Sequence, residues 1–466
     1  MVQISDYSGK HVHMIGIGGS SMSGLAELLQ QKGYIVSGSD STRSYLTQKL
    51  TEKGIAVTIG HDAKNIDGAD IVIYSAAIHA ENPERAAARA AGIPQLERAV
   101  LLGQLMSGFD MAINICGTHG KTTTTSMVSE ILMDAGKDPT IHIGGQLDYI
   151  GGSTKLGDPH LMVVEACEYQ ASFLQFHPTI AVVTNIEEDH LDYYKDLDDI
   201  FRSFCRFAAL LPEDGWCLGN GDDPLVCDLL RKQACHTASF GLNPACDWQP
   251  THIVWDENGC AEFDIRYHGE QKAHLHLSIP GEFNMIHAVA AVACASVVGV
   301  SPEAAAASLS RFQAPHRRFE LTGTVCGVKL YTDYAHNPAE MQNAVSNAYH
   351  QPHNRLWAVI QPHTYSRLKT LFDDYIHCCD LADEILVTDI FAAREKDPGD
   401  IHSTMLVDAI AKTGQSVHYT PGFDDTEAYL RSHWQPGDIV ITMSCGNINL
   451  LNSQIQDHGD SWPDPA

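Results

Sequence analysis

The chain has 466 residues, enough for roughly three domains. Its 58 acidic residues outnumber its 30 basic residues, and the net charge is −28. This charge argues against DNA or an anionic membrane surface as a partner, but it is compatible with a local site for a phosphorylated small molecule. The 13 cysteines are scattered without metal-ligand spacing, which indicates a reduced chain.

The amino-terminal sequence leads directly into a strand and lacks the apolar run of a signal peptide. No stretch approaches the ~20 apolar residues that a membrane-spanning helix needs. We therefore expect a cytoplasmic chain that binds neither membranes nor nucleic acids, and that is a monomer or a weak homodimer. Apolar runs alternate with helical patterns along the chain, which predicts an α/β fold.

The first predicted motif is a strand, a glycine turn and a helix at residues 11–31. A second strand ends at Asp40, about twenty residues after the glycines, which loosely fits a dinucleotide-binding fingerprint. A turn of this kind can bind NAD, another nucleotide diphosphate or nothing, and the spacing leaves all three open. The next strand ends in the small residues Ser75 and Ala76, which favours a ligand crevice at that edge of the sheet.

A phosphate loop is predicted after the apolar run that ends at Cys116. The sequence from Gly117 to Thr123 reads Gly-Thr-His-Gly-Lys-Thr-Thr, and a helical pattern follows. Backbone N–H groups of such a loop surround an anion, and the helix N-terminus adds its positive end. Lys121 is expected to reach the β- and γ-phosphates, and the Thr122 hydroxyl is expected to hold Mg²⁺. The common loop would have its first glycine at the position of Ile115, so this is a shorter variant.

Two further strands carry polar residues at their carboxyl ends. The buried strand predicted at 161–168 ends in a carboxylate, where a phosphate-loop domain places its metal-binding acid, and Glu165 is the expected ligand. The strand at 179–185 leads into an acidic segment with His190, a candidate ligand of a second metal; a capping or core histidine is the alternative. Short antiparallel strands are predicted at 247–279 as an insert.

The last third of the chain again alternates strands and helices. Arg317 and Arg318 follow a linking segment and could clamp a γ-phosphate, or they could be a solvated pair. His363 and Arg367 follow a strand end, where an arginine can hold a carboxylate through two parallel hydrogen bonds; the start of a surface helix is the alternative.

Together, these motifs resemble the Mur ligase family and, within it, the branch that adds L-alanine. The resemblance runs over roughly residues 10–455, and its motifs follow one another in the expected order. They are Ile15–Gly24, Gly38–Asp40, Ser75–Ile78, Gly117–Thr123, Thr184–Asp192, His316–Phe319, Asp333–Pro338, Gln361–Arg367 and Ala392–Glu395.

The resemblance implies three domains. These are a Rossmann-like UDP-sugar domain at 1–107, a central phosphate-loop ATPase domain with a mostly parallel sheet at 108–314, and a Rossmann-like amino-acid domain at 315–466. The implied activity joins L-alanine to the carboxylate of UDP-N-acetylmuramate in peptidoglycan precursor synthesis. ATP and Mg²⁺ are required, and the carboxylate is first converted to an acyl phosphate.

The resemblance also implies a set of site residues, which the chain supplies from all three domains. The UDP-sugar residues are Gly16, Gly18, Gly19, Ser20, Ser21, Met22, Ser23, Asp40, Ser75 and Ala76. The ATP residues are Gly117, Thr118, His119, Gly120, Lys121, Thr122, Thr123, Asn284, His287, Arg318 and Asp333. The amino-acid residues are Tyr334, His336, His363 and Arg367. The metal ligands are Thr122, Glu165 and His190, and the catalytic residues are Lys121, His190, Arg318 and His336, with His336 or His190 as the proton acceptor.

Three positions depart from the family pattern. Ser21 stands where a glycine is usual, and it would be strained if that position needs a positive φ. Cys167 and Asn447 stand where aspartates are common. These departures motivate one alternative to the ligase, a binding or regulatory protein that retains the fold but not the turnover. A second alternative is a ligase of the same family that attaches a tripeptide to the same sugar. A third, from the glycine turn at residues 16–24, is an NAD-dependent oxidoreductase.

Overall fold

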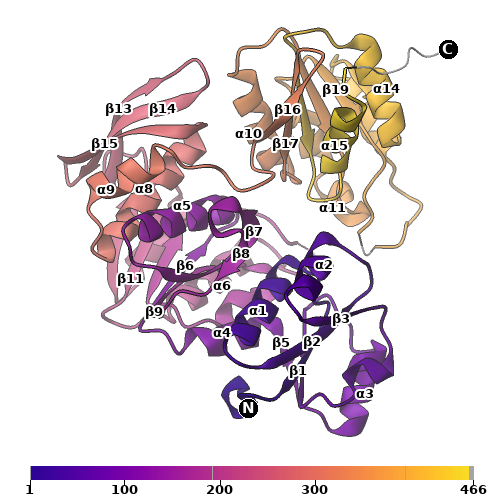
Figure 1. Cartoon of the computed structure of the whole chain (residues 1–466). Helices are drawn as coiled ribbons and strands as arrows, with labels where there is room; N and C mark the ends of the chain where they lie inside the picture. Colours follow the sequence, from indigo (N-terminus) through magenta and orange to yellow (C-terminus); the bar gives the residue numbers. More distant parts are fainter. Residues whose placement is uncertain (1, 192, 394, 461–466) are drawn as a thin grey trace. The chain divides into compact units, whose positions relative to one another are not determined.

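The computed structural model describes residues 2–191, 193–393 and 395–460; Asp192 and Arg394, which belong to two of the predicted motifs, lie outside these ranges. The chain forms three β-sheets in two compact units (Figure 1). The first compact unit comprises Met1–Ile253, Glu262–Ser278 and Glu282–Gln313, and the second comprises Val254–Ala261, Ile279–Gly281 and Ala314–Ala466. The predicted α/β class with mostly parallel sheets is confirmed. The boundaries at 107 and 314 stay predictions.

The first sheet has five parallel strands in the order β3-β2-β1-β4-β5. Its strands are β1 (His11–Ile15), β2 (Ile35–Asp40), β3 (Ala56–Ile59), β4 (Ile71–Tyr74) and β5 (Gln95–Glu97). Its helices are α1 (Ser20–Gln31), α2 (Tyr45–Glu52), α3 (Pro83–Ala91) and α4 (Arg98–Met106). The strands β1 and β4 are neighbours, so the turn after β1 and the small residues after β4 meet at one edge.

The second sheet has ten strands in the order β15-β14-β13-β12-β11-β10-β6-β9-β7-β8. Its strands are β6 (Met111–Cys116), β7 (Pro139–Leu147), β8 (Gly152–Lys155), β9 (Asp158–Glu165), β10 (Ile180–Val183), β11 (Trp216–Asn220), β12 (His236–Phe240), β13 (Trp248–Trp255), β14 (Cys260–Tyr267) and β15 (Glu270–Pro280). Its helices are α5 (Lys121–Asp134), α6 (Leu197–Ala208), α7 (Pro224–Arg231), α8 (Glu282–Val297) and α9 (Pro302–Leu309). The region predicted as an antiparallel insert forms β13, β14 and β15, which extend one edge of this sheet.

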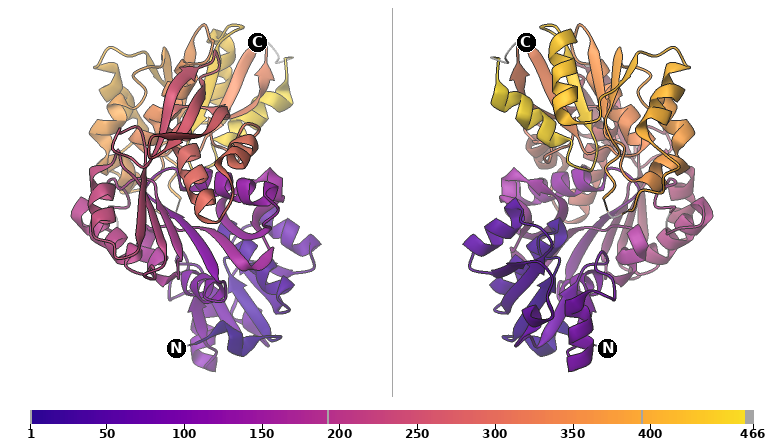
Figure 2. Two further views of the ribbon diagram at one scale, coloured as in Figure 1. Left: turned by 90° about the vertical axis from the view of Figure 1, so that its left-hand side faces the viewer. Right: turned by 90° about the vertical axis from the view of Figure 1, so that its right-hand side faces the viewer.

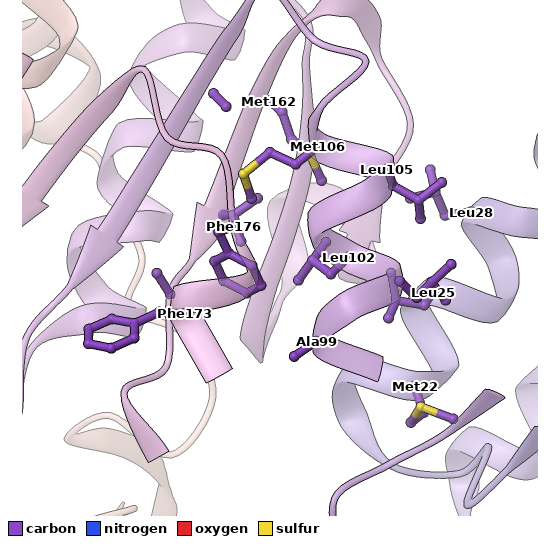
Figure 3. Packing of buried hydrophobic residues seen from close by; sticks show 14 of the residues in the cluster. Met22, Leu25, Leu28, Ala99, Leu102, Leu105, Met106, Met162, Phe173 and Phe176 are labelled. Atoms are coloured by element: carbon purple, nitrogen blue, oxygen red, sulfur yellow. The ribbon is translucent and has the colours of Figure 1, made fainter. Parts of the chain in front are cut away.

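One hydrophobic core joins the first two sheets. Side chains of α1 and α4 pack against β9 and the segment that follows it (Figure 3). Met22 and Leu25 come from α1, Met106 from α4, and Met162 and Phe173 from the second sheet and its connection. Burial of such large apolar side chains contributes about 1.5–3 kcal/mol each. This shared core fixes the glycine turn of the first sheet relative to the central sheet.

The third sheet has six strands in the order β16-β17-β21-β18-β19-β20, and β16 pairs with β17 in the antiparallel sense. Its strands are β16 (Glu320–Val325), β17 (Val328–Asp333), β18 (Leu356–Ile360), β19 (Glu384–Val387), β20 (Val417–Tyr419) and β21 (Ile439–Met443). Its helices are α10 (Pro338–Tyr349), α11 (Tyr365–Thr370), α12 (Phe372–His377), α13 (Ser403–Ala411), α14 (Phe423–His433) and α15 (Asn449–His458). Helices flank this sheet (Figure 2), as in a Rossmann-like domain.

Within the described ranges, no helix has both the length and the apolar character that a membrane span requires. The 13 cysteines all lie in these ranges, and each is a free thiol.

Candidate active site

The predicted phosphate loop lies between β6 and α5. Gly117 and Gly120 have φ angles of 141° and 81°, which a side chain would strain. A Cβ atom at Gly120 would lie 2.1 Å from His287 Nε2, and one at Gly117 would lie 1.9 Å from Thr184 Oγ1. A larger residue at either position would therefore have to displace its neighbour. The crowding also brings His287 of α8 against the loop, with Asn284 about one turn earlier on the same helix.

The segment after β10 is hydrogen-bonded to the phosphate loop. The Thr118 N–H donates to the Asn185 carbonyl at 3.1 Å, and the His119 N–H donates to Asn185 Oδ1 at 2.8 Å. The Thr184 hydroxyl donates to the His119 carbonyl at 2.6 Å. Thr123 is buried in the first turn of α5. These hydrogen bonds within the protein hold the loop in place without any contact from a nucleotide.

Lys121 is surrounded by acceptors. Its ammonium group lies 2.6 Å from the Gly117 carbonyl, 2.8 Å from the Thr118 carbonyl and 2.9–3.0 Å from the two Glu168 oxygens. Burial lowers the pKa of Lys121, but the charge of Glu168 outweighs it, and the net pKa is raised. Glu168 in turn stays ionised, since Lys121 and His190 lower its pKa more than burial raises it. His190 Nε2 lies 3.5 Å from Glu168.

Thr122 and Glu165, the predicted metal ligands, lie side by side. The Thr122 hydroxyl is 3.0 Å from Glu165 Oε1, and Glu165 Oε2 accepts from the Gly144 N–H at 2.8 Å. Two oxygens that occupy adjacent positions around an octahedral Mg²⁺, each at ~2.1 Å, are about 3 Å apart, so this pair fits the ion. In the described part of the chain, no group of three or more His, Cys, Asp or Glu is arranged to hold a metal by itself. A magnesium ion usually takes one or two protein ligands and completes its shell with phosphates and water.

His190, predicted as a further metal ligand, contacts Glu168 and Asp189. It has a positive φ of 55°, and its ring lies 4.7 Å from that of Tyr169. The acidic partner Glu168 was missed as a site residue from the sequence, although it follows Glu165 by three positions. Cys167, between them, has its pKa raised to about 11 by burial, so it adds no charge where an aspartate is common.

The glycine turn of the first sheet carries the predicted UDP-sugar residues. The Gly18 N–H donates to Asp40 Oδ2 at 2.9 Å, and a Cβ atom at Gly16 would lie 3.4 Å from Ser75 Oγ. Ala76 follows Ser75 at the end of β4. The turn, Asp40 and the end of β4 are therefore brought together, as the sequence predicted.

The residues after the turn form the start of α1, with Gly19 as its N-cap and Ser20 as its first residue. Ser21 is helical, so the strain expected of a serine at a glycine position does not arise. Met22 is only 2% exposed and packs in the shared core, so its side chain faces away from the crevice. The buried Ser23 hydroxyl donates to the Ser20 carbonyl.

The second compact unit brings the predicted amino-acid residues together after β17 and β18. The rings of His336 and His363 are 6.1 Å apart, and the ring of Tyr334 is 5.7 Å from that of His336. Arg367 Nη1 lies 3.2 Å from His363 Nδ1. Glu340, which the sequence did not single out, lies 2.9 Å from His336 Nδ1.

The two arginines after the linking segment have different surroundings. Arg317 donates to the carbonyls of Ser444 and Gly446, the latter at 3.0 Å, so it anchors the loop after β21. Both guanidinium groups lie over the ring of Tyr334, Arg317 at 4.9 Å and Arg318 at 5.2 Å. The bonds to the loop after β21 distinguish Arg317 from Arg318, which stays the predicted nucleotide residue.

Asp333, at the end of β17, is held by backbone N–H groups. It accepts from Phe319 and Ala335, both at 2.7 Å. Burial raises the pKa of Asp333 to about 6, although these bonds and the charge of Arg318 act in the opposite direction. Asn447 accepts from the Gln361 side chain at 2.9 Å, a role that an amide fills without the charge of an aspartate.

Comparison with known proteins gives three successive matches. Residues 11–110 match the Mur ligase family catalytic domain, 115–295 the Mur ligase middle domain, and 317–446 the Mur ligase glutamate ligase domain. UDP-N-acetylmuramate–L-alanine ligases from Caldanaerobacter subterraneus and Acetivibrio thermocellus are each 45% identical to this chain. The first alignment covers 94% of this chain and 95% of the relative, and the second covers 94% of each.

Solved structures agree with the fold. The UDP-N-acetylmuramate-alanine ligase MurC from Thermotoga maritima has a TM-score of 0.83 at 24% identity, and the alignment covers 96% of this chain and 98% of that chain. A murein peptide ligase from Psychrobacter arcticus has a TM-score of 0.74 at 24% identity, over 98% of this chain and 100% of that chain. The matches to all three domain models and the 45% identity over nearly the whole length establish that this chain belongs to the Mur ligase family.

Proposed function

We propose that this chain joins L-alanine to the carboxylate of UDP-N-acetylmuramate at the expense of ATP. The observation that carries the proposal is the 45% identity, over nearly the full length, to relatives named for this reaction. The cluster of Lys121, Thr122 and Glu165 supports it, because activation of a carboxylate by ATP needs a phosphate cradle with a magnesium site.

In the first half of the reaction, the sugar carboxylate attacks the γ-phosphate and an acyl phosphate forms. Two anions approach each other, so positive groups must neutralise their charge. We assign this role to Lys121 and Arg318. Mg²⁺ held by Thr122 and Glu165, with His190 as a candidate second ligand, would supply further neutralisation.

The nucleotide is held by the rest of the predicted ATP site. The backbone of Gly117 to Thr123 surrounds the phosphates, and Asn284 and His287 contact the adenine. Asp333, with its raised pKa, is also assigned to the nucleotide. Lys121 must exchange its loop carbonyls and Glu168 for phosphate oxygens when ATP binds.

In the second half, the amino group of L-alanine attacks the acyl carbon and phosphate leaves. Tyr334, His363 and Arg367 orient the amino acid, with Arg367 holding its carboxylate. His336 takes the ammonium proton, and the neighbouring Glu340 orients its ring. His190 is the alternative acceptor.

The glycine turn Gly16–Gly19, the first residues of α1, Asp40 and Ser75 hold the UDP-sugar. The diphosphate would lie at the N-terminus of α1, where backbone N–H groups and the helix dipole favour an anion. We further propose a cytoplasmic enzyme, a monomer or weak homodimer, with no membrane or nucleic acid partner.

The test is ADP release with Mg²⁺, UDP-N-acetylmuramate and either L-alanine or the tripeptide L-alanyl-γ-D-glutamyl-meso-diaminopimelate. We expect release that depends on L-alanine and not on the tripeptide. Release with the tripeptide alone would assign the chain to the peptide-adding ligases. No ADP with either would contradict a ligase function, and bound NAD in the purified protein would revive the oxidoreductase alternative.

A further inference from the structure

His142 is a buried histidine that the proposed mechanism does not use. It lies on β7 of the central sheet and is only 3% exposed. Its Nε2 atom lies 2.8 Å from Ser21 Oγ, at the start of α1, and its Nδ1 atom lies 3.0 Å from Thr154 Oγ1 on β8. The ring therefore connects the UDP-sugar turn of the first sheet to two strands of the second.

Arg98, at the start of α4, also contacts Ser21. Its Nη1 donates to Ser21 Oγ at 3.0 Å, and an arginine can only donate. The Ser21 hydroxyl keeps its own proton and can donate it to His142 Nε2; in that arrangement Nδ1 carries the ring proton and donates to Thr154. Burial, together with the charge of Arg98, lowers the pKa of His142 to about 3, in agreement with a neutral ring.

The same surface is packed too tightly for α1 to shift. A Cβ atom at Gly24 would lie 1.9 Å from Thr154 Oγ1, so helix and strand are in direct contact. Ser153 donates to the Ser20 carbonyl at 3.2 Å, and the Ser20 hydroxyl donates to the Gly144 carbonyl at 3.3 Å. The helix N-terminus is thus placed by hydrogen bonds from both β7 and β8.

β7 also reaches the ATP side of the site. The Gly144 N–H, two residues beyond His142, donates to Glu165 Oε2, and the other Glu165 oxygen is the partner of Thr122. One strand therefore contacts the UDP-sugar turn at His142 and the magnesium ligand at Gly144. A shift of α1 along β7 would change the separation of the two bound substrates, and reaction rates are steeply sensitive to such a change.

We propose that His142 is a positioning residue that, through Ser21, holds the UDP-sugar turn in register with the phosphate loop. The inference rests on the proposed function, which places UDP-N-acetylmuramate at this turn. Arg98 donates to Ser21 at one end of this link, and Thr154 contacts the His142 ring at the other.

The experiment is a double-mutant cycle with Ser21→Ala, His142→Leu and the combined variant. Each single change should raise the KM for UDP-N-acetylmuramate about tenfold, leave the KM for ATP within twofold, and lower kcat less than threefold. The combined variant should be no worse than either single variant, because both changes remove the same link. Ser21→Thr keeps the hydroxyl and should restore the KM.

Ser129→Ala is the matched control, since it removes a buried serine hydroxyl from α5 outside this link. It should leave the KM for UDP-N-acetylmuramate, the KM for ATP and kcat unchanged. Amide hydrogen exchange of residues 20–25 gives a readout independent of turnover. It should accelerate in Ser21→Ala and in His142→Leu, and it should not change in Ser129→Ala. An unchanged KM for the UDP-sugar in an active Ser21→Ala protein, or additive effects in the cycle, would overturn the inference. A wild-type protein that makes no ADP would overturn the proposed function instead.

Discussion

Two glycine turns of the first compact unit carry out related tasks in different ways. The phosphate loop contains a charged lysine, and the protein itself supplies the counter-charge in Glu168. The turn after β1 is held by Asp40, which accepts from the Gly18 backbone, and by a chain of hydrogen bonds through Ser21. A site with a buried charged side chain needs a counter-charge from the protein before its ligand binds. A site built on backbone N–H groups carries no such charge and can be positioned by packing and hydrogen bonds.

The ion pair in the phosphate loop predicts the largest effect. Lys121→Met should lower kcat roughly 10²–10³-fold, as the loss of one transition-state charge partner does. It should also lower the free energy of unfolding by about 3–5 kcal/mol, because Glu168 is left buried without its cation. Urea unfolding and ADP release measure the two effects separately.

The control for this variant is the combined change of Lys121→Met and Glu168→Gln. It removes both charges, so stability should recover while turnover stays low. Recovery of turnover in the combined variant would mean that the stability loss, and not the missing charge, had reduced kcat.

A buried acid beneath the UDP-sugar turn predicts the next effect. The Glu84 carboxylate is fully buried and accepts hydrogen bonds from His13, Ser39, Asn65 and His61. Burial alone would raise the pKa of Glu84, but these bonds lower it to about 2. Glu84→Ala should therefore cost about 3 kcal/mol of unfolding free energy at pH 7.

The pH dependence of this contribution has a definite sign. A carboxyl group whose pKa is lower in the folded state stabilises the protein above its ordinary pKa of 4.5, and that stability is lost as the pH falls toward 2. The difference in unfolding free energy between the wild type and Glu84→Gln should thus shrink between pH 5 and pH 3. A constant difference over this range would contradict an ionised Glu84.

A pair of glycine substitutions compares the two turns directly. Gly120 and Gly16 have similar φ angles of 81° and 79°, so alanine costs about 1–2 kcal/mol of backbone strain at either. Only at Gly120 does the new Cβ also collide with a ring, that of His287, whereas at Gly16 it meets Ser75 Oγ at 3.4 Å. Two fold-changes are compared: that in the KM for ATP caused by Gly120→Ala, and that in the KM for the UDP-sugar caused by Gly16→Ala. The first should be about ten times larger than the second.

The smallest predicted effect concerns Glu130, a buried acid on α5. Burial, and then the charge of Asp134, raise the pKa of Glu130 to about 7. The folded protein therefore holds a proton that the unfolded chain releases, and stability falls as the pH rises from about 4.5 through 7. Glu130→Gln should be more stable than the wild type by about 1 kcal/mol at pH 8, after allowance for solvent screening, and equal to it at pH 5. Thermal melts at the two pH values test this, and equal melting temperatures at pH 8 would contradict it.

Sequence patterns predicted the parts of the site that lie at strand ends. The Thr122–Glu165 pair follows from the order of strand, loop and helix, since parallel strands bring their carboxyl ends to one edge. The grouping of His336, His363 and Arg367 was expected on the same grounds and from the resemblance. The confirmed fold class rests on the alternation of strand and helix patterns.

Other features depend on side chains that meet only in the folded chain. Glu168 pairs with a lysine 47 residues away, and His142 with a serine 121 residues away. Nothing in the local pattern marks either as more than an ordinary strand or loop residue. The role of Arg317 as an anchor for the loop after β21 was likewise invisible, because its acceptors are backbone carbonyls, which carry no sequence signal.

The contacts that the Lys121 ammonium group already makes also affect how an inhibitor of the proposed ATP site should be designed. A compound that mimics only the adenine leaves the Lys121–Glu168 pair intact, so none of its binding free energy is spent on breaking that pair. An anionic compound must first draw the ammonium group away from a carboxylate and two carbonyls, so its net gain is smaller than the charge of Lys121 suggests. A neutral ligand that leaves this ion pair intact therefore has the more favourable starting point.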